Sequence, residues 1–359
     1  MADMFALWAQ GDGLSPAFPE DEKKTREYVQ HCVDHGVTRL IPGGNPPLLV
    51  QIAHENGLEV DTYRGVNTYG LYQASYEMSM EYVLPYLGAP EARETLDKHR
   101  PMHAIREYNL NIQDPFAINN RQFWNKTQDG RIEPLYNERV SLSFGYQEVR
   151  EHEADLFINA HKESKSDGTQ LEFVLMNMDN SGVNNYGYED PIVETFKDLY
   201  SKDPFQISND DPDWLQHRAD YTTEFVREIR QKLSTDSPGA RLTSTLIARE
   251  PSEYIKVFQD WPKWIDEKLV DEFYIWFRTT NDLKEVQRQT EHTANVIDGR
   301  VPFIVELSCY HPGSFQEPDI LIEAARIARD NGADAVGLYR SHAVEQLNLW
   351  HAVDEIRKL

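Results

Sequence analysis

Residues 169–176 read TQLEFVLM, and the alternation within this stretch decides the fold. Leu171, Phe173 and Leu175 fall on one side of an extended chain, and Gln170, Glu172 and Val174 fall on the other. Strand-like runs recur along the chain at residues 38–42, 58–65, 102–112, 242–248, 272–278, 302–308 and 335–339. A helix-like stretch follows each run, so the sequence predicts repeated strand–helix units and a parallel sheet.

Eight such units close a (β/α)8 barrel, the α/β fold called a TIM barrel. A chain of 359 residues fits one barrel with loop insertions, and we expect a single domain over residues 1–359. Two long polar segments, 108–146 and 178–212, predict long loops after the third and fourth strands. Because the active site of such a barrel lies at the C-terminal ends of its strands, both loops are expected on the catalytic face.

Composition excludes several classes of partner. The chain carries 60 acidic and 36 basic residues, a net charge of −24, which argues against nucleic acid and anionic membranes. No apolar run reaches the ~18 residues of a membrane span. The first ten residues lack the basic region and cleavage site of a signal peptide, so a secreted or periplasmic location requires that such a segment was removed. The sequence does not indicate an oligomeric state.

Motifs for cofactors and metals are weak. Cys32 and Cys309 are the two cysteines, too few for a disulfide framework or a metal–thiolate cluster. The pair Gly43 and Gly44 is too short to form a phosphate cradle. Three histidines fall near strand ends without the spacing of a zinc motif: His103, His311 and His342. We therefore expect no cofactor and no metal.

The alternation in three strands predicts which side chains enter the barrel lumen. Large apolar residues should meet the surrounding helices, so their neighbours in sequence face inward. This places Glu172 in the lumen from the fourth strand and Glu306 from the seventh. The run 272–278 directs another inward set: Tyr274, Trp276 and Arg278.

Two inward glutamates on strands four and seven are the strongest catalytic signal. A buried carboxylate is costly unless it is paired or its pKa moves, and each glutamate alone could be a structural partner of a lumen Arg, Tyr or Gln. Together they match glycoside hydrolysis, which needs two carboxyl groups on either side of the scissile bond. A separation of about 5–5.5 Å would indicate retention of configuration, and about 6.5–9.5 Å would indicate inversion.

Other side chains at strand ends and in the long loops suit sugar binding. Trp276 or Tyr274 could form an apolar floor under a sugar ring, and the loop residues Trp124, Asn184, Asn185 and Tyr186 could approach the lumen mouth. The further candidates for substrate binding are Asp114, Asn177, Arg278, Tyr339, Arg340 and His342. Acidic residues near strand ends, such as Asp282, have an alternative reading as helix caps. Arginines gather at the same rim, and a guanidinium suits a uronic-acid or sulfated glycan unless it pairs with a neighbouring carboxylate.

The tract 141–177 resembles the glycoside hydrolase-like (β/α)8 barrels, distant relatives of the α-amylase superfamily. Residues 148–150 read EVR and residues 167–173 read DGTQLEF, with Glu172 where that family usually has Asp. Weaker similarity continues at 213–215 and 331–339. The resemblance implies a glycosidase that degrades an oligo- or polysaccharide by a retaining mechanism, with Glu172 as nucleophile and Glu306 as acid/base. Another group of retaining barrels places these roles the other way round.

Two alternatives remain open. A non-catalytic carbohydrate-binding barrel would keep the aromatic and amide residues but hold the glutamates too far apart for one bond. A metal-dependent isomerase or aldolase barrel would instead need three or four converging carboxylate and His ligands.

Overall fold

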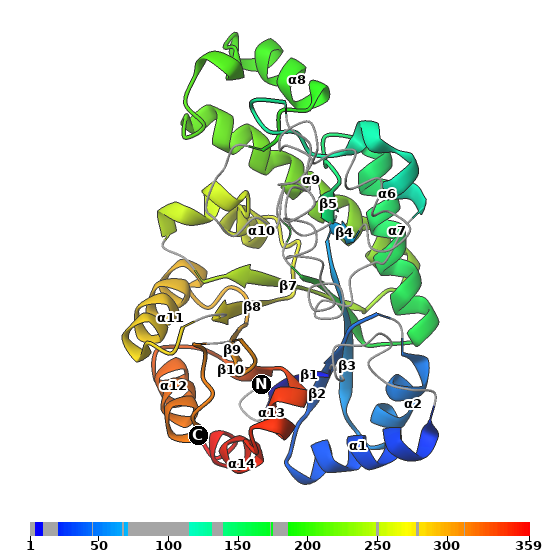
Figure 1. Ribbon diagram of the computed structural model, residues 1–359, viewed down its shortest axis with the longest axis vertical. Helices are drawn as coiled ribbons and strands as arrows, with labels where there is room; N and C mark the ends of the chain where they lie inside the picture. Colours follow the sequence, from blue (N-terminus) through cyan, green and yellow to red (C-terminus); the bar gives the residue numbers. More distant parts are fainter. Residues whose placement is uncertain are drawn as a thin grey trace, which may run out of the picture.

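The protein, seen here in a computed structural model, is a closed barrel of eight parallel strands surrounded by helices (Figure 1). The structure describes residues 4–9, 21–44, 46–66, 68–70, 115–130, 139–172, 174, 186–248, 251–277, 280–311 and 313–359. The barrel strands, in their order around the barrel, are β1 (Phe5–Ala9), β2 (Arg39–Pro42), β3 (Glu59–Gly65), β6 (Gly168–Glu172), β7 (Arg241–Ile247), β8 (Glu272–Phe277), β9 (Phe303–Ser308) and β10 (Ala335–Tyr339). The predicted (β/α)8 barrel is confirmed.

Helices connect the strands on the outside of the barrel. The longer ones are α1 (Glu22–Asp34), α2 (Pro47–Glu55), α7 (Gln147–Ser164), α9 (Pro212–Asp236), α11 (Leu283–Ile297) and α12 (Pro318–Asp330). Shorter elements are α6 (Pro115–Asn119), η1 (Arg121–Phe123), α8 (Asp190–Tyr200), η2 (Pro204–Gln206), η3 (Pro251–Val257), α10 (Trp261–Asp266), α13 (Ser341–Gln346) and α14 (Trp350–Ile356). A two-stranded antiparallel sheet, β4 (Thr68–Gly70) with β5 (Arg139–Ser141), lies outside the barrel.

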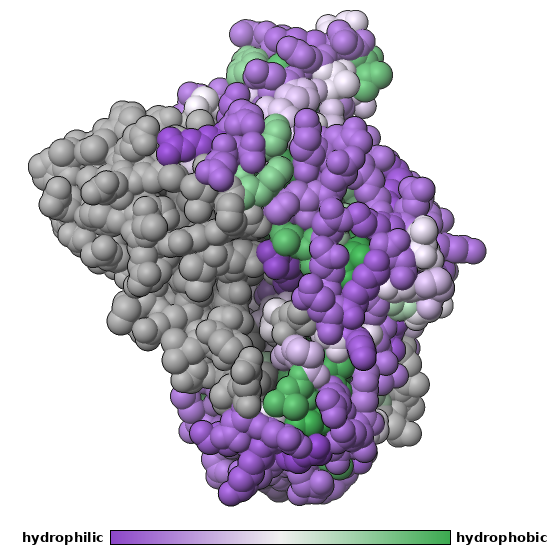
Figure 2. Space-filling view, turned by 90° about the vertical axis from the view of Figure 1, so that its right-hand side faces the viewer, coloured by the Kyte–Doolittle hydropathy of each residue, from purple (hydrophilic) through white to green (hydrophobic). Residues whose placement is uncertain are grey.

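The described surface is largely hydrophilic on the face drawn in Figure 2, with small hydrophobic areas between polar ones. Four large apolar side chains of the described part are exposed: Leu199, Phe205, Leu347 and Leu359. Among the described helices, none combines the length and the hydropathy that crossing a membrane requires.

The sequence analysis missed the first strand of the barrel and counted the run 102–112 as the third. Residues 5–9 form β1, which pairs with β2 and β10 and so closes the barrel. The run 102–112, expected to be the third strand, lies outside the described residues. The third strand of the barrel is β3, which pairs directly with β6 in a register that joins Gly65 to Glu172. The strand β1 escaped detection because its inward residues, Ala6 and Trp8, are as apolar as its outward ones.

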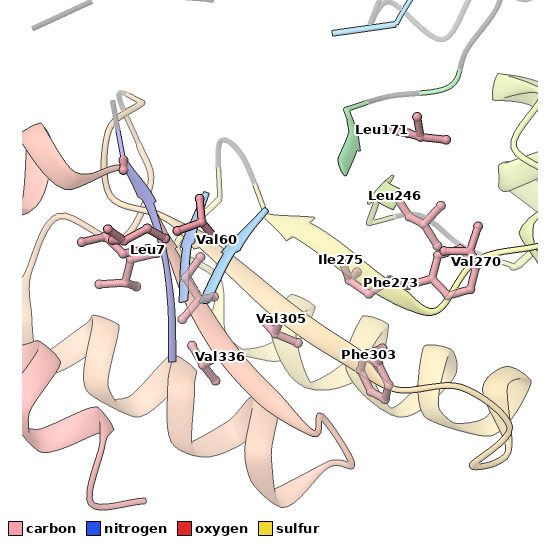
Figure 3. Close-up of a cluster of buried hydrophobic side chains, with 14 of the residues drawn as sticks. Leu7, Val60, Leu171, Leu246, Val270, Phe273, Ile275, Phe303, Val305 and Val336 are labelled. Atoms are coloured by element: carbon pink, nitrogen blue, oxygen red, sulfur yellow. The ribbon is translucent and has the colours of Figure 1, made fainter. Parts of the chain in front are cut away.

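The strand faces agree with the predicted alternation. Outward residues pack under the helices in the main hydrophobic core, where Figure 3 shows Leu171, Phe273, Ile275, Phe303 and Val305. A separate cluster lies in the lumen and contains Ala6, Trp8, Ile41, Tyr63, Tyr274, Ile304, Ala335 and Tyr339. Glu172 and Glu306 alternate with the outward residues, so both face inward, as predicted.

Inward side chains form levels of four, one from every second strand, because each strand is staggered by about one residue against the next. The strand registers define three levels that matter for function. The lower level holds Ile41, Gln170, Tyr274 and Gly337. The middle level holds Trp8, Tyr63, Thr245 and Glu306. The upper level, nearest the C-terminal ends of the strands, holds Gly43, Glu172, Trp276 and Tyr339.

An ion network closes the opposite, N-terminal end of the barrel. Arg39 is buried and binds the carboxylates of Glu272 and Glu59, and its Nη1 donates to the Tyr274 hydroxyl at 2.9 Å. Asp61 accepts from Arg241 at 2.9 Å. Gly168 makes room for this network, since a Cβ there would lie 2.6 Å from the Asp61 carboxylate. The buried charges are thus paired, as buried charges must be.

The segment after β6, together with Phe258 from the segment after β7, builds a cap with its own hydrophobic core. This cap core contains Tyr186, Tyr188, Ile192, Val193, Phe196, Trp214, Leu215, Ala219 and Phe258. In Figure 1, α8 lies at the top of the molecule, and α9 leads from there toward the barrel. The cap is joined to the loop after β3 by a bridge between Thr127 and Tyr186. Glu189 strengthens the joint, because its buried carboxylate accepts from the Lys126 backbone and the Ser143 hydroxyl.

Candidate active site

Glu172 and Glu306 lie at the C-terminal ends of β6 and β9, in the upper and middle levels of the lumen. Only 3% of Glu172 and 2% of Glu306 is exposed. The apolar neighbours of each glutamate in sequence face outward, which turns both glutamate side chains inward. Leu171 precedes Glu172, and Val305 and Leu307 flank Glu306. The strand pattern therefore forces two carboxyl groups into one buried space.

The two carboxyl groups interact electrostatically. Burial raises the pKa of Glu306 well above its ordinary value, and the nearby Glu172 charge raises it further. Both effects disfavour the ionised form, so Glu306 holds its proton at pH values where an exposed glutamate is ionised. Two like-charged carboxyls in a desolvated space titrate as a pair that retains one proton.

Aromatic rings stand around the pair. Trp276 and Tyr339, both in the Glu172 level, meet edge to face with their ring centroids 5.8 Å apart. The His311 ring stacks on Tyr339 at 5.7 Å with an interplanar angle of 10°, and it meets Trp276 edge to face at 5.6 Å. These rings give the site an apolar wall with polar edges, which suits the faces and hydroxyls of a sugar.

The hydrogen bonds of His311 fix its tautomer. Its Nδ1 lies 2.9 Å from the Ser308 hydroxyl. The backbone N–H groups of Tyr310 and His311 both donate to that oxygen, at 3.4 and 3.5 Å. The hydroxyl proton is therefore directed at Nδ1, and we assign the ring proton to Nε2, which makes that nitrogen a donor.

Arg340 brings a positive charge to the same rim. It follows β10 directly, is 1% exposed, and its guanidinium carbon lies 3.8 Å from the centroid of the Tyr310 ring. Its charge reaches Tyr63, whose pKa it lowers against larger opposing effects. The His342 ring contacts Tyr310 at 5.0 Å, so Arg340 and His342 share one aromatic neighbour. Both predicted rim residues thus lie beside the aromatic wall.

Tyr274 does not belong to the sugar floor that the sequence predicted. Its hydroxyl accepts from Arg39, which belongs to the ion network at the N-terminal end of the barrel, so the hydroxyl is directed away from both glutamates and is already paired. The inward direction of Tyr274 was predicted correctly, but alternation alone does not give the depth of a side chain in the lumen. Trp276, two residues further along β8, shares the Glu172 level instead.

The loop residues expected at the mouth have packing roles where the structure describes them. Trp124 is fully buried in the main core, and its indole N–H donates to the Ala117 carbonyl at 2.7 Å. Tyr186 is 5% exposed and packs in the cap core. The predicted role of both residues at the lumen mouth is therefore wrong. Asn184 and Asn185 lie outside the described residues.

Three predicted substrate-binding residues, Asp114, Asn177 and Arg278, also lie outside the described residues. Asp282 caps α11 by accepting from the Lys284 backbone, which confirms its alternative reading as a helix cap. Within the described ranges, no three His, Cys, Asp or Glu side chains converge as a metal ion would require.

The sequence analysis overlooked Tyr63. This residue of β3 shares the middle level with Glu306, and it interacts electrostatically with Tyr339, Glu172 and Glu306. The signal was available, because Val60 faces outward and the alternation in 58–65 then turns Asp61 and Tyr63 inward.

A (β/α)8 barrel with two coupled carboxyl groups at the ends of its fourth and seventh strands has the architecture and the acidic pair of a glycoside hydrolase-like protein. The family model called "Glycosyl hydrolase-like 10" matches residues 101–314, more than half of the chain. The chain belongs to this family. No curated protein matches the sequence.

Solved structures with this fold include several glycosidases. The glycoside hydrolase domain of PgaB (BpsB) from Bordetella bronchiseptica superposes with a TM-score of 0.63 at 11% identity, covering 98% of each chain. The β-galactosidase of the Antarctic haloarchaeon Halorubrum lacusprofundi gives 0.64 at 12% identity, covering 99% of this chain and 58% of that one. The β-galactosidase of the psychrophilic Marinomonas ef1 gives 0.60 at 11% identity, covering 94% and 54%. The chain thus spans a little over half the length of these β-galactosidases, and the likeness concerns the fold.

Proposed function

We propose that this protein hydrolyses a glycosidic bond in an oligo- or polysaccharide, with Glu172 and Glu306 as its two catalytic carboxyl groups. The observation that carries the proposal is the electrostatic coupling of two buried carboxyls at the catalytic end of the barrel. Burial of an acidic pair is costly, and a raised pKa in one member supplies the acid that leaving-group departure needs. A polysaccharide substrate would fit a secreted or periplasmic enzyme.

The proposed mechanism is retaining. One carboxylate attacks the anomeric carbon while the other carboxyl group gives its proton to the glycosidic oxygen. The bond between that carbon and the glycosidic oxygen breaks, the leaving group departs as an alcohol, and the remaining sugar becomes esterified to the enzyme. The second residue then takes a proton from water, which attacks the same carbon and releases the carboxylate. Trp276 and Tyr339 would contact the sugar, and Arg340 would bind an anionic substituent such as a uronic-acid carboxylate or a sulfate.

The test uses Glu172→Gln and Glu306→Gln with neutral, uronic-acid and sulfated glycans. Each variant should lose at least about 10³-fold in kcat, because each removes a group needed at the transition state. Glu291→Gln, an exposed residue of α11, is the matched control and should keep full activity. Full activity in both lumen variants would disprove the pair, whereas glycan binding without cleavage by the wild type would indicate a non-catalytic sugar-binding barrel.

Azide rescue assigns the roles of the two glutamates. In a retaining enzyme, azide replaces a missing nucleophile and yields a glycosyl azide of inverted configuration. Rescue of an acid/base variant yields the azide with retained configuration, because the covalent intermediate still forms. The resemblance predicts inversion for a Glu172→Ala variant, and the opposite arrangement predicts it for Glu306→Ala.

A further inference from the structure

The middle and lower levels of the lumen carry a group of polar side chains that the mechanism does not use. They are Tyr63, Gln170 and Thr245, which we call the lumen triad. Exposure is 2% for Tyr63, 0% for Gln170 and 1% for Thr245. Among the residues that the structure describes, the Tyr63 and Thr245 hydroxyls and both amide atoms of Gln170 have no hydrogen-bond partner. Buried polar groups of this kind are usually paired with protein, water or a ligand.

The strand register brings the triad together. Tyr63 and Gln170 are direct partners on the neighbouring strands β3 and β6, with Glu172 two residues beyond Gln170. Thr245 is the direct partner of Glu172 across β6 and β7, and it shares the middle level with Tyr63 and Glu306. The triad therefore lies beside and beneath the two glutamates, on the half of the lumen formed by β3, β6 and β7.

The Tyr63 ring reaches toward the upper level through a space that Gly43 leaves open. A Cβ placed at Gly43 would lie 3.4 Å from the Tyr63 hydroxyl and from two of its ring atoms. Gly43 is the one member of the Glu172 level without a side chain. The phenol thus lies close to both glutamates, and its charge interactions with Glu172 and Glu306 agree with that position.

We propose that the lumen triad is the floor of the sugar-binding subsite and hydrogen-bonds the hydroxyl groups of the ring next to the cleaved bond. This inference rests on the proposed function, which states that the cleaved bond is a glycosidic bond. A phenol, an alcohol and an amide together both donate and accept, which matches neutral hydroxyls and has no charge for an anion. The ring over the triad is therefore a neutral sugar with free hydroxyls, and any anionic group lies toward Arg340, at the rim.

The binding test is separate from catalysis. Affinities of the Glu172→Gln protein are measured by calorimetry for galactose, glucose, mannose and N-acetylglucosamine, and then for singly deoxygenated forms of the sugar that binds. Tyr63→Phe, Gln170→Met and Thr245→Val are each added to that background. We expect each to weaken binding about 5- to 10-fold, the effect of one hydrogen bond. The deoxy sugar that lacks the contacted hydroxyl should bind equally to the matching variant and its parent.

The control is Tyr274→Phe, which removes a buried lumen hydroxyl that already has Arg39 as its partner. It should lower stability without changing sugar affinity. Unchanged affinity in all folded triad variants, or no binding of any of the four sugars, would overturn the proposal and make the triad a site of internal water alone. Loss of cleavage in Glu306→Gln tests the proposed function separately. If Glu306→Gln kept its cleavage activity, the proposed function would be wrong, but the dependence of sugar binding on the triad would still stand.

Discussion

Glu306 links catalysis to stability through its proton. Its pKa is raised by burial and by Glu172, so the folded state holds a proton that the unfolded state releases above about pH 4.5. Because the folded state binds more protons in this range, stability falls as pH rises from the unfolded pKa toward the folded one. The glutamine of Glu306→Gln has no such proton to lose.

We therefore expect Glu306→Gln to gain stability relative to wild type as pH increases from 4.5 to 8. The gain amounts to about 1.4 kcal/mol for each unit by which the folded pKa exceeds the unfolded one. Urea denaturation across this pH range measures it, and Glu291→Gln should show no such trend. Glu189, whose pKa burial raises to about 7, adds the same slope to every variant and cancels in the comparison. A constant difference between Glu306→Gln and wild type would show that Glu306 titrates normally.

At the scale of elements, the contact between the cap and the loop after β3 depends on Glu189. Its buried carboxylate accepts hydrogen bonds from the Lys126 backbone N–H and the Ser143 hydroxyl. Glu189→Ala leaves those two donors without their acceptor, at a cost of about 1–3 kcal/mol. We expect faster proteolysis within residues 186–215 and a lower melting temperature. Glu194→Ala, an exposed change on α8, is the control and should behave as wild type. Equal cleavage rates in both variants would mean that the cap core alone holds the segment.

The elements also differ in how well the sequence predicts them. The strands β6, β8 and β9 were predictable, with both glutamates facing inward, because their outer faces carry large apolar residues, whereas their inner faces include polar residues as well. β1 was missed because its two faces are equally apolar. The cap core was missed because its residues come from separate segments, none of which has a periodicity that reveals the others. The level of a side chain depends on the stagger between strands, which no single strand records. This is why Tyr274 was misplaced.

The whole molecule carries a net charge of −24. Like charges repel more in the compact state than in the unfolded chain, and salt screens them with a Debye length of about 10 Å at 0.1 M and about 3 Å at 1 M. We expect the melting temperature to rise as sodium chloride increases from 0.05 to 1 M at pH 8, with most of the gain below about 0.3 M. Acidification to pH 5 reduces the negative charge and should shrink the gain. A melting temperature independent of salt at pH 8 would show that local ion pairs balance the net charge.

The helix α9 belongs to two cores at once. Its first half places Trp214, Leu215 and Ala219 in the cap core, and its second half places Phe225, Val226, Ile229 and Leu233 in the barrel core. Tyr221 touches both cores at the junction. Tyr221 therefore marks a position at which the cap could be replaced by that of a relative. The new cap would supply its own hydrophobic core, and the half of α9 that packs on the barrel would stay unchanged. The cap could then be exchanged in one piece, without redesigning the catalytic strands.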